Sequence, residues 1–150
     1  MAKIRAHQIN NKINSKASRD QGCCSKQHPW FSFECMTTNS KYCLSALAPG
    51  IEREQTLVGL YKKLAELSSK PWLHWTQQPK NTGLETISYD QLRFSPRSTV
   101  TLTKDTTLFV FRFDTHLGCG KGRIIGYKNK PCSVLQIIGF DFDHSAYNHG

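Results

Sequence analysis

Long apolar runs are absent from this sequence. No stretch approaches the roughly 18 consecutive apolar residues that a membrane-spanning helix needs. The opening segment, MAKIRAHQINNKINSK, has no apolar region of the kind found in secretory signals. Acidic residues are also few, with 11 against 20 lysines and arginines, so the formal net charge is +9. We therefore expect a cytoplasmic protein with no membrane association and with an anionic partner.

Cysteine patterns typical of zinc sites are absent as well. The six cysteines include no C-x-x-C pair. Cys23, Cys24 and His28 lack the spacing and the fourth ligand of a zinc site. The glycine-rich segment DTHLGCGKG departs from the phosphate-binding pattern G-x-x-x-x-G-K-[ST], and it leads into a predicted strand rather than a helix. The sequence therefore predicts no metal site and no bound cofactor.

Basic residues concentrate at the start of the chain. Residues 1–27 contain six lysines and arginines against one acid, Asp20. This segment has no hydrophobic periodicity, which is typical of a disordered arm. We therefore divide the chain into a flexible basic arm over residues 1–27 and a single domain over residues 28–150. The arm favours nucleic acid as the partner, with Lys3 and Arg5 as candidate contacts, and a solubilising tail is the alternative.

Hydrophobic periodicity predicts two helices in the middle of the chain. The segment IEREQTLVGLYKKLAELSSK, residues 51–70, carries apolar residues at spacings of three and four, the pattern of a helix with one buried stripe. The members of this stripe are Leu57, Leu60, Tyr61, Leu64 and Leu67. Pro71 ends this helix. The segment PWLHWTQQ, residues 71–78, predicts a short second helix that begins at a proline.

Alternating apolar residues predict strands on either side of the helices. Before the helices, WFSFECM (residues 30–36) has one strongly apolar face. After the helices, LETISYDQLRF (84–94) is expected to contain a short strand or two. The strands that follow are TLFVFRF (107–113), GRIIGYK (122–128) and CSVLQIIGF (132–140). Short turns between consecutive strands favour antiparallel neighbours. We therefore predict an α+β domain in which an N-terminal strand and two helices pack on an antiparallel β-meander.

Cations in and beside the predicted strands are candidate nucleic-acid contacts. These residues are Arg93, Arg112, Lys121, Arg123 and Lys128. A guanidinium group suits two phosphate oxygens at once. A buried arginine is costly without a partner. The alternatives are therefore a position in water at a strand end, or an ion pair with Asp141, Asp143 or Glu85.

The end of the last predicted strand is rich in polar residues. The segment FDFDHSAY, residues 140–147, contains His144, a residue type whose free pKa lies near neutrality. Tyr147 can donate a hydrogen bond to a phosphate or to a leaving oxygen. General acid–base help of this kind supports RNA cleavage without a metal, because the RNA 2′-hydroxyl supplies the nucleophile. A solvent-exposed terminus without function is the alternative.

The closing strands of the chain resemble those of a known family. The stretch GRIIGYKNKPCSVLQIIGFDFDHSAY, with the element order over residues 51–147, resembles the RelE/ParE superfamily of small bacterial toxins. The resemblance implies a metal-independent endoribonuclease that cuts mRNA, often in the ribosome, and is blocked by an antitoxin protein. It implies that Arg123 holds the scissile phosphate, that His144 acts as acid or base, and that Tyr147 positions the substrate. Members of the ParE branch instead poison gyrase.

Two other functions fit the same sequence. A non-enzymatic binder would use the basic arm and the sheet to hold nucleic acid or an acidic protein. Such a binder could be an inhibitor of a host machine, encoded by a phage or a mobile element. A structural or interaction domain would instead meet a partner protein through exposed aromatic residues. The sequence-based prediction is therefore a toxin-like endoribonuclease acting on RNA, with these two functions as alternatives.

Overall fold

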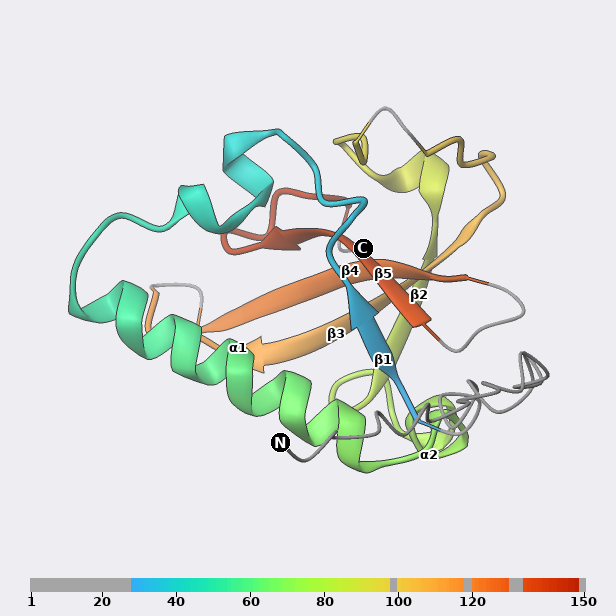
Figure 1. The fold of residues 1–150 in the computed structure, drawn as a ribbon, viewed down its shortest axis with the longest axis horizontal. Coiled ribbons are helices and arrows are strands. Elements are labelled where there is room, and N and C mark those ends of the chain that lie inside the picture. Colours follow the sequence, from blue (N-terminus) through green and yellow to red (C-terminus); the bar gives the residue numbers. More distant parts are fainter. Residues whose placement is uncertain (1–27, 98–99, 118–119, 130–133, 149–150) are drawn as a thin grey trace, which may run out of the picture.

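The described chain folds into one mixed sheet and two helices. The computed structural model describes residues 28–97, 100–117, 120–129 and 134–148. The predicted arm over residues 1–27, with Lys3 and Arg5, lies outside the described residues. The two helices lie against a five-stranded sheet (Figure 1). This arrangement confirms the predicted α+β class.

The elements follow the predicted order along the chain. Strand β1 comprises Trp30–Ser32, helix α1 Ile51–Ser69 and helix α2 Trp72–Gln77. The remaining strands are β2 (Leu84–Ser88), β3 (Thr107–Asp114), β4 (Lys121–Asn129) and β5 (Val134–Asp141). Both predicted helices and the three long C-terminal strands are thereby confirmed, with small differences at their ends.

The sheet combines antiparallel and parallel pairing. Its strands lie in the order β1-β5-β4-β3-β2. Strands β2 to β5 form the predicted antiparallel meander. Strand β1 joins the far side of β5 in parallel, with Trp30 opposite Val134. The last strand of the described chain therefore lies inside the sheet, and the N-terminal strand forms its edge (Figure 1).

The N-terminal strand is shorter than the sequence predicts. Strand β1 ends at Ser32, and a turn follows in which the Met36 amide donates to the Phe33 carbonyl over 3.1 Å. The turn interrupts the alternation of side chains, so Cys35 is buried on the face opposite the helices. The predicted strand over residues 30–36 is therefore wrong beyond Ser32.

The helices lie over one face of the sheet (Figure 1). They pack on it with apolar side chains. The buried members of this layer from α1 and α2 are Leu60, Leu67, Trp72 and Trp75. They pack on Phe111 and Ile124 of the central strands. Tyr61 departs from the predicted stripe, because it is 72% exposed.

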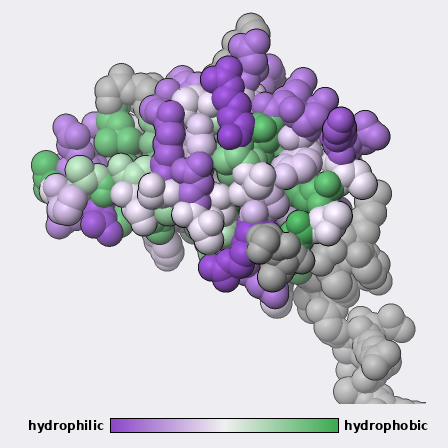
Figure 2. Space-filling model, turned by 90° about the horizontal axis from the view of Figure 1, so that it is seen from above, coloured by the Kyte–Doolittle hydropathy of each residue, from purple (hydrophilic) through white to green (hydrophobic). Residues whose placement is uncertain are grey.

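The opposite face of the sheet carries a second apolar layer. Irregular segments within residues 33–47, 89–102 and 142–148 supply its outer side chains. Tyr42 stacks on Phe94 in this layer, with ring centroids 4.5 Å apart. In the view from above, polar side chains dominate the surface and apolar residues form separate patches (Figure 2). Both faces of the sheet are therefore covered by other parts of the chain, so neither is open to a large ligand.

Helix α1 crosses the end of β3 at Gly59. A Cβ atom at this position would lie 2.1 Å from the carbonyl oxygen of Asp114, closer than real Cβ atoms approach any neighbour. Glycine is therefore the residue that allows this close approach of helix and strand. The crossing places Lys62 and Lys63, one turn further along α1, beside the edge of β3.

Candidate nucleic-acid interface

Arg112, Arg123 and Asp141 form one row across the three central strands. Arg112 on β3 lies opposite Arg123 on β4, which in turn lies opposite Asp141 on β5. A β-bulge at Gly126 shifts the register of β4 and β5. Without this shift, Phe140 would lie opposite Arg123 and the carboxylate would point to the other face.

The Arg123 guanidinium is buried and loosely paired. Arg123 is 5% exposed and Asp141 is fully buried, with 3.9 Å between Nη1 and Oδ2. That separation gives Coulomb attraction but is too long for a hydrogen bond. The Nε and Nη1 atoms of Arg123 make no hydrogen bond within the described residues. The ring of Tyr147 lies against the guanidinium, with 5.8 Å from Cζ to the ring centroid, and adds a cation–π contact.

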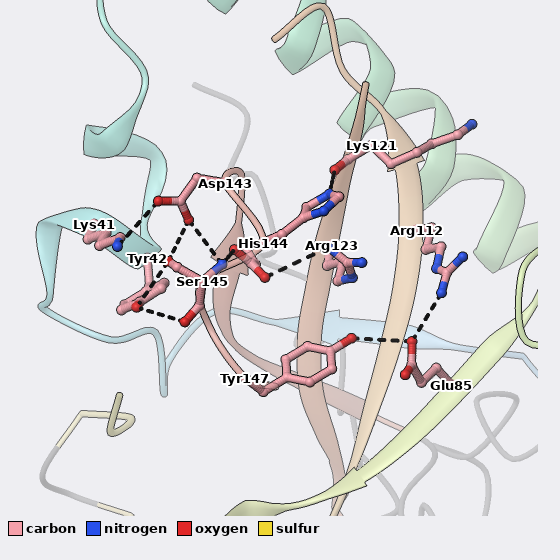
Figure 3. A network of polar contacts seen from close by, with 11 residues as sticks. Lys41, Tyr42, Glu85, Arg112, Lys121, Arg123, Asp143, His144, Ser145 and Tyr147 are labelled. Carbon is pink, nitrogen blue, oxygen red and sulfur yellow. Dashed lines mark hydrogen bonds and ion pairs between the residues drawn. The ribbon is translucent and has the colours of Figure 1, made fainter. Parts of the chain in front are cut away.

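Tyr147 ties the C-terminal segment to β2. Its hydroxyl donates to Oε2 of Glu85 over 3.2 Å, and Nη2 of Arg112 donates to the same oxygen over 3.5 Å (Figure 3). Nζ of Lys80 lies 2.9 Å from the other oxygen, Oε1. Arg123 on β4 contacts the same tyrosine. Side chains from five segments of the chain therefore meet around the buried charges of Glu85 and Arg123.

The pKa shifts in this cluster follow from burial and charge. Burial raises the pKa of Tyr147, and the charge of Glu85 raises it further, so the tyrosine is a neutral donor. Burial also acts against the ionised form of Glu85. Lys80, Tyr147 and Arg112 together outweigh burial, so the pKa of Glu85 lies below its usual value. The cluster therefore holds a carboxylate at neutral pH.

His144 lies in a tight turn after β5. Its φ of 61° is in the left-handed region, which few non-glycine residues adopt. Its Nε2 lies 2.8 Å from the carbonyl oxygen of Lys121. The amide of Ser145 donates to Oδ1 of Asp141 over 3.0 Å and to Oδ1 of Asp143 over 3.3 Å (Figure 3). These contacts hold a turn that carries the C-terminal segment back over the sheet.

The three residues predicted as catalytic lie near one another but form no open site. Arg123 and Tyr147 are buried, and His144 is half-exposed. A substrate phosphate would reach the Arg123 guanidinium only if the segment that carries Tyr147 moved aside. Cations that a ligand can reach do gather in a cleft at the edge of the sheet.

A cleft of about 600 Å³ opens beside α1, where β3 extends beyond β2. Strand β2 begins opposite Phe111, so the last three residues of β3 have no strand beside them on that edge of the described sheet. Helix α1 forms one wall, and the turn before β2 forms another. The charged residues that line the cleft are Lys62, Lys63, Glu66, Arg112, Asp114 and Lys121.

Positive charge exceeds negative charge in this cleft. Lys63 pairs with Glu66 over 3.1 Å, and Lys121 pairs with Asp114. The hydrogen bond and the charge of Lys121 hold the pKa of Asp114 below its usual value. Lys62 makes no ion pair with a described residue, and the Arg112 side chain is 31% exposed. The cleft therefore presents cationic groups that an anionic ligand can reach.

The cleft brings together predicted and unpredicted residues. Arg112 and Lys121 were both expected from the sequence to contact phosphate. Lys62, Lys63 and His116 were missed. Both lysines lie outside the apolar stripe that the sequence predicts for this helix, where charged residues are typical of a solvated surface. In the structure only Lys62 is exposed, whereas the Lys63 side chain is 11% exposed and its Nζ lies 5.0 Å from the ring centroid of Trp75. The adjacency of the two lysines in the sequence was the available signal.

The other predicted contacts lie elsewhere. Arg93 borders a separate hollow of about 530 Å³, and its amide donates to the Ala146 carbonyl over 2.8 Å. Nζ of Lys128 lies 5.1 Å from the ring centroid of Trp72, on the face that the helices cover. Lys3 and Arg5 lie outside the described residues.

Comparisons with known proteins add no family to this description. Protein-family models, curated proteins and solved structures all give no match to the chain. Within the described ranges, no group of three or more histidine, cysteine, aspartate or glutamate residues could hold a metal ion. No described helix combines the length and the apolar character needed to cross a membrane. The functional argument therefore rests on the chemistry of the cleft.

Proposed function

We propose that the protein is a non-enzymatic nucleic-acid binder that holds a phosphate backbone in the cleft between α1 and the edge of β3. The observation that carries this proposal is the excess of cations over carboxylates in the cleft. Arg112 offers a planar fork to phosphate oxygens, and Lys62 offers a compact charge on a long stem. Neutralised phosphates release counterions, which supplies affinity. RNA in the cytoplasm is the partner that we propose first.

Replacing Lys62 and Lys121 together with glutamine is expected to weaken RNA binding about tenfold or more at ~0.1 M salt. Each lysine that leaves a phosphate removes about one unit from the slope of log K against log salt concentration. The slope of the double variant is therefore expected to be shallower than that of the wild type. Fluorescence anisotropy of a labelled RNA over a series of salt concentrations measures both quantities.

The matched control is a double variant of Lys70 and Lys104, also to glutamine. Both lysines are exposed and lie outside the cleft, so the change in net charge is the same. This control is expected to bind RNA much as the wild type does. Equal weakening by the two double variants would mean that binding is diffuse and that the cleft is not the site. A complex insensitive to salt would argue against a phosphate backbone as the ligand.

A second candidate function is metal-independent RNA cleavage, which the RelE/ParE resemblance implies. The favouring observation is the half-exposed imidazole of His144, 2.8 Å from the carbonyl oxygen of Lys121, whose side chain lines the cleft. The 2′-hydroxyl would attack the adjacent phosphorus and the 5′-oxygen would leave, with His144 transferring a proton. The product would carry a 2′,3′-cyclic phosphate. The partners would then be mRNA, the ribosome and an antitoxin protein.

Under this second proposal, His144→Ala is expected to slow cleavage of labelled RNA in EDTA by about 100-fold or more. His74→Ala, which changes a histidine on α2, is the control and is expected to keep wild-type activity. Reactions with and without ribosomes test cleavage of RNA on the ribosome and of free RNA. Wild-type protein that cuts no RNA in either reaction would remove this candidate and leave binding alone.

A further inference from the structure

The cleft proposed for a phosphate backbone is lined by two carboxylates as well, Glu66 and Asp114. A carboxylate beside a phosphate is unfavourable, because the like charges repel. Glu66 lies on α1, is 54% exposed and pairs with Lys63, a side chain that is only 11% exposed. Asp114 ends β3, and its side chain is 78% exposed. Asp114 is therefore the carboxylate that a ligand in the cleft reaches more easily.

The neighbours of Asp114 are cations proposed to hold phosphates. Asp114 lies opposite Lys121 on β4, and the two side chains form an ion pair. Arg112 lies two residues earlier on β3, so its side chain and that of Asp114 leave the same face of the strand about 7 Å apart. A group bound by Asp114 is therefore close to a phosphate bound by Arg112 or Lys121. In a nucleic acid, the groups joined to each phosphate are sugars.

Asp114 offers a ligand hydrogen-bond acceptors and no donor. The hydrogen bond and the charge of Lys121 hold the pKa of Asp114 below its usual value, so the carboxyl group is ionised at neutral pH. An ionised carboxylate has about four acceptor sites, so the contact with Lys121 leaves sites for a second donor. The 2′-hydroxyl of ribose is such a donor, and it distinguishes RNA from DNA. Within a DNA strand the sugar has no hydroxyl, so DNA meets only the repulsion of the carboxylate.

We infer that Asp114 selects RNA over DNA by accepting a hydrogen bond from a ribose 2′-hydroxyl while Arg112 and Lys121 neutralise adjacent phosphates. This inference rests on the proposed nucleic-acid binding and assigns the preference for RNA to one residue. The carboxylate repels the phosphates of either nucleic acid, but it gains a hydrogen bond only with RNA. Its removal is therefore expected to change the affinities for RNA and DNA in opposite directions.

The test measures binding of the full chain to three labelled single strands by fluorescence anisotropy. The strands are an RNA of about 12 nucleotides without uracil, the DNA of the same sequence, and the same RNA with 2′-O-methyl groups, which have no donor. The wild type is expected to bind the RNA about tenfold more tightly than either other strand, the lower end for a hydrogen bond to a charged group, because Asp114 is exposed. Asp114→Ala is expected to bind DNA more tightly than the wild type does and to bind all three strands with nearly equal affinity.

Glu66→Ala is the matched control, because it removes the other carboxylate from the same cleft. It is expected to strengthen the binding of all three strands alike and to keep the preference for RNA. Selection by Asp114 is overturned, while backbone binding stands, if the wild type binds RNA no more tightly than DNA or the 2′-O-methyl strand. The same conclusion follows if Asp114→Ala keeps the preference, or if Glu66→Ala removes it equally. If the wild type binds none of the three strands, the proposed function fails, and the inference fails with it.

Discussion

Asp141→Asn is expected to lower the free energy of unfolding by about 3 kcal/mol, the lower end of the range for breaking a buried ion pair. Arg123 is only 5% exposed, so the guanidinium left behind cannot regain water. The lower end applies because the pair is 3.9 Å apart and makes no hydrogen bond. Asparagine keeps the oxygen that accepts from the Ser145 amide. Urea unfolding followed by circular dichroism measures the loss.

Asp143→Asn is the matched control, because it makes the same substitution at an exposed carboxylate two residues later. Its side chain is 56% exposed and pairs with Lys41 in water. The expected cost is no more than about 1 kcal/mol. Replacing both members of the buried pair, as Arg123→Met with Asp141→Leu, is expected to restore most of the stability. If the double variant were no more stable than Asp141→Asn, the stability lost in Asp141→Asn would not come from the buried charge of Arg123 left without its partner.

Tyr147→Ala is expected to cost about 3–5 kcal/mol, as for other large buried aromatic residues. Tyr147→Phe is expected to cost about 1–2 kcal/mol, because it removes one of the two hydrogen bonds to Oε2 of the buried Glu85 carboxylate and leaves that from Arg112. The difference follows from the structure. Tyr147 is 2% exposed, and its hydroxyl donates to Glu85 over 3.2 Å. Alanine removes the ring and leaves a cavity, whereas phenylalanine removes only the hydrogen bond. Urea unfolding of both variants measures the two costs.

Tyr61→Ala is the control for this pair, because it removes the same side chain at a site that is 72% exposed. Its effect on stability is expected to stay within about 0.5 kcal/mol. The Tyr147 variants also separate anchoring from catalysis. If Tyr147→Phe unfolded like the wild type but abolished RNA cleavage, the hydroxyl would act on substrate. The anchoring role described for it would then be wrong.

Local patterns predict the long elements of this fold. The leucine spacing of α1 and the alternation in residues 107–113 specify a helix and a strand without reference to the rest of the chain. Two features depend on distant partners and could not be predicted in this way. The parallel pairing of Trp30 with Val134 joins opposite ends of the domain. The second apolar layer comes from irregular segments that have no hydrophobic period.

The candidate site could likewise be predicted from the sequence only in part, because some of its residues meet through contacts that are distant in the sequence. Arg112 and Lys121 can be singled out as cations in a predicted strand and loop. Lys62 joins them only because Gly59 lets α1 approach β3, a backbone contact that one sequence does not reveal. An ion pair of Arg123 with Asp141 was one of the alternatives that the sequence left open. The bulge at Gly126 decides which residue of β5 faces that arginine.

The position of β5 between β1 and β4 has a consequence for the order of folding. A ribosome makes β1 and the leucine face of α1 before it makes the central strands on which they pack. The strands of the meander, β2 to β5, each pair with the strand next to them in the sequence. Strand β1 instead pairs with β5, which lies about 100 residues later in the sequence, so β1 has no partner until β5 has been made. During synthesis the leucine face of α1 therefore stays exposed to chaperones until the central strands have emerged, and β1 stays unpaired until β5 has emerged.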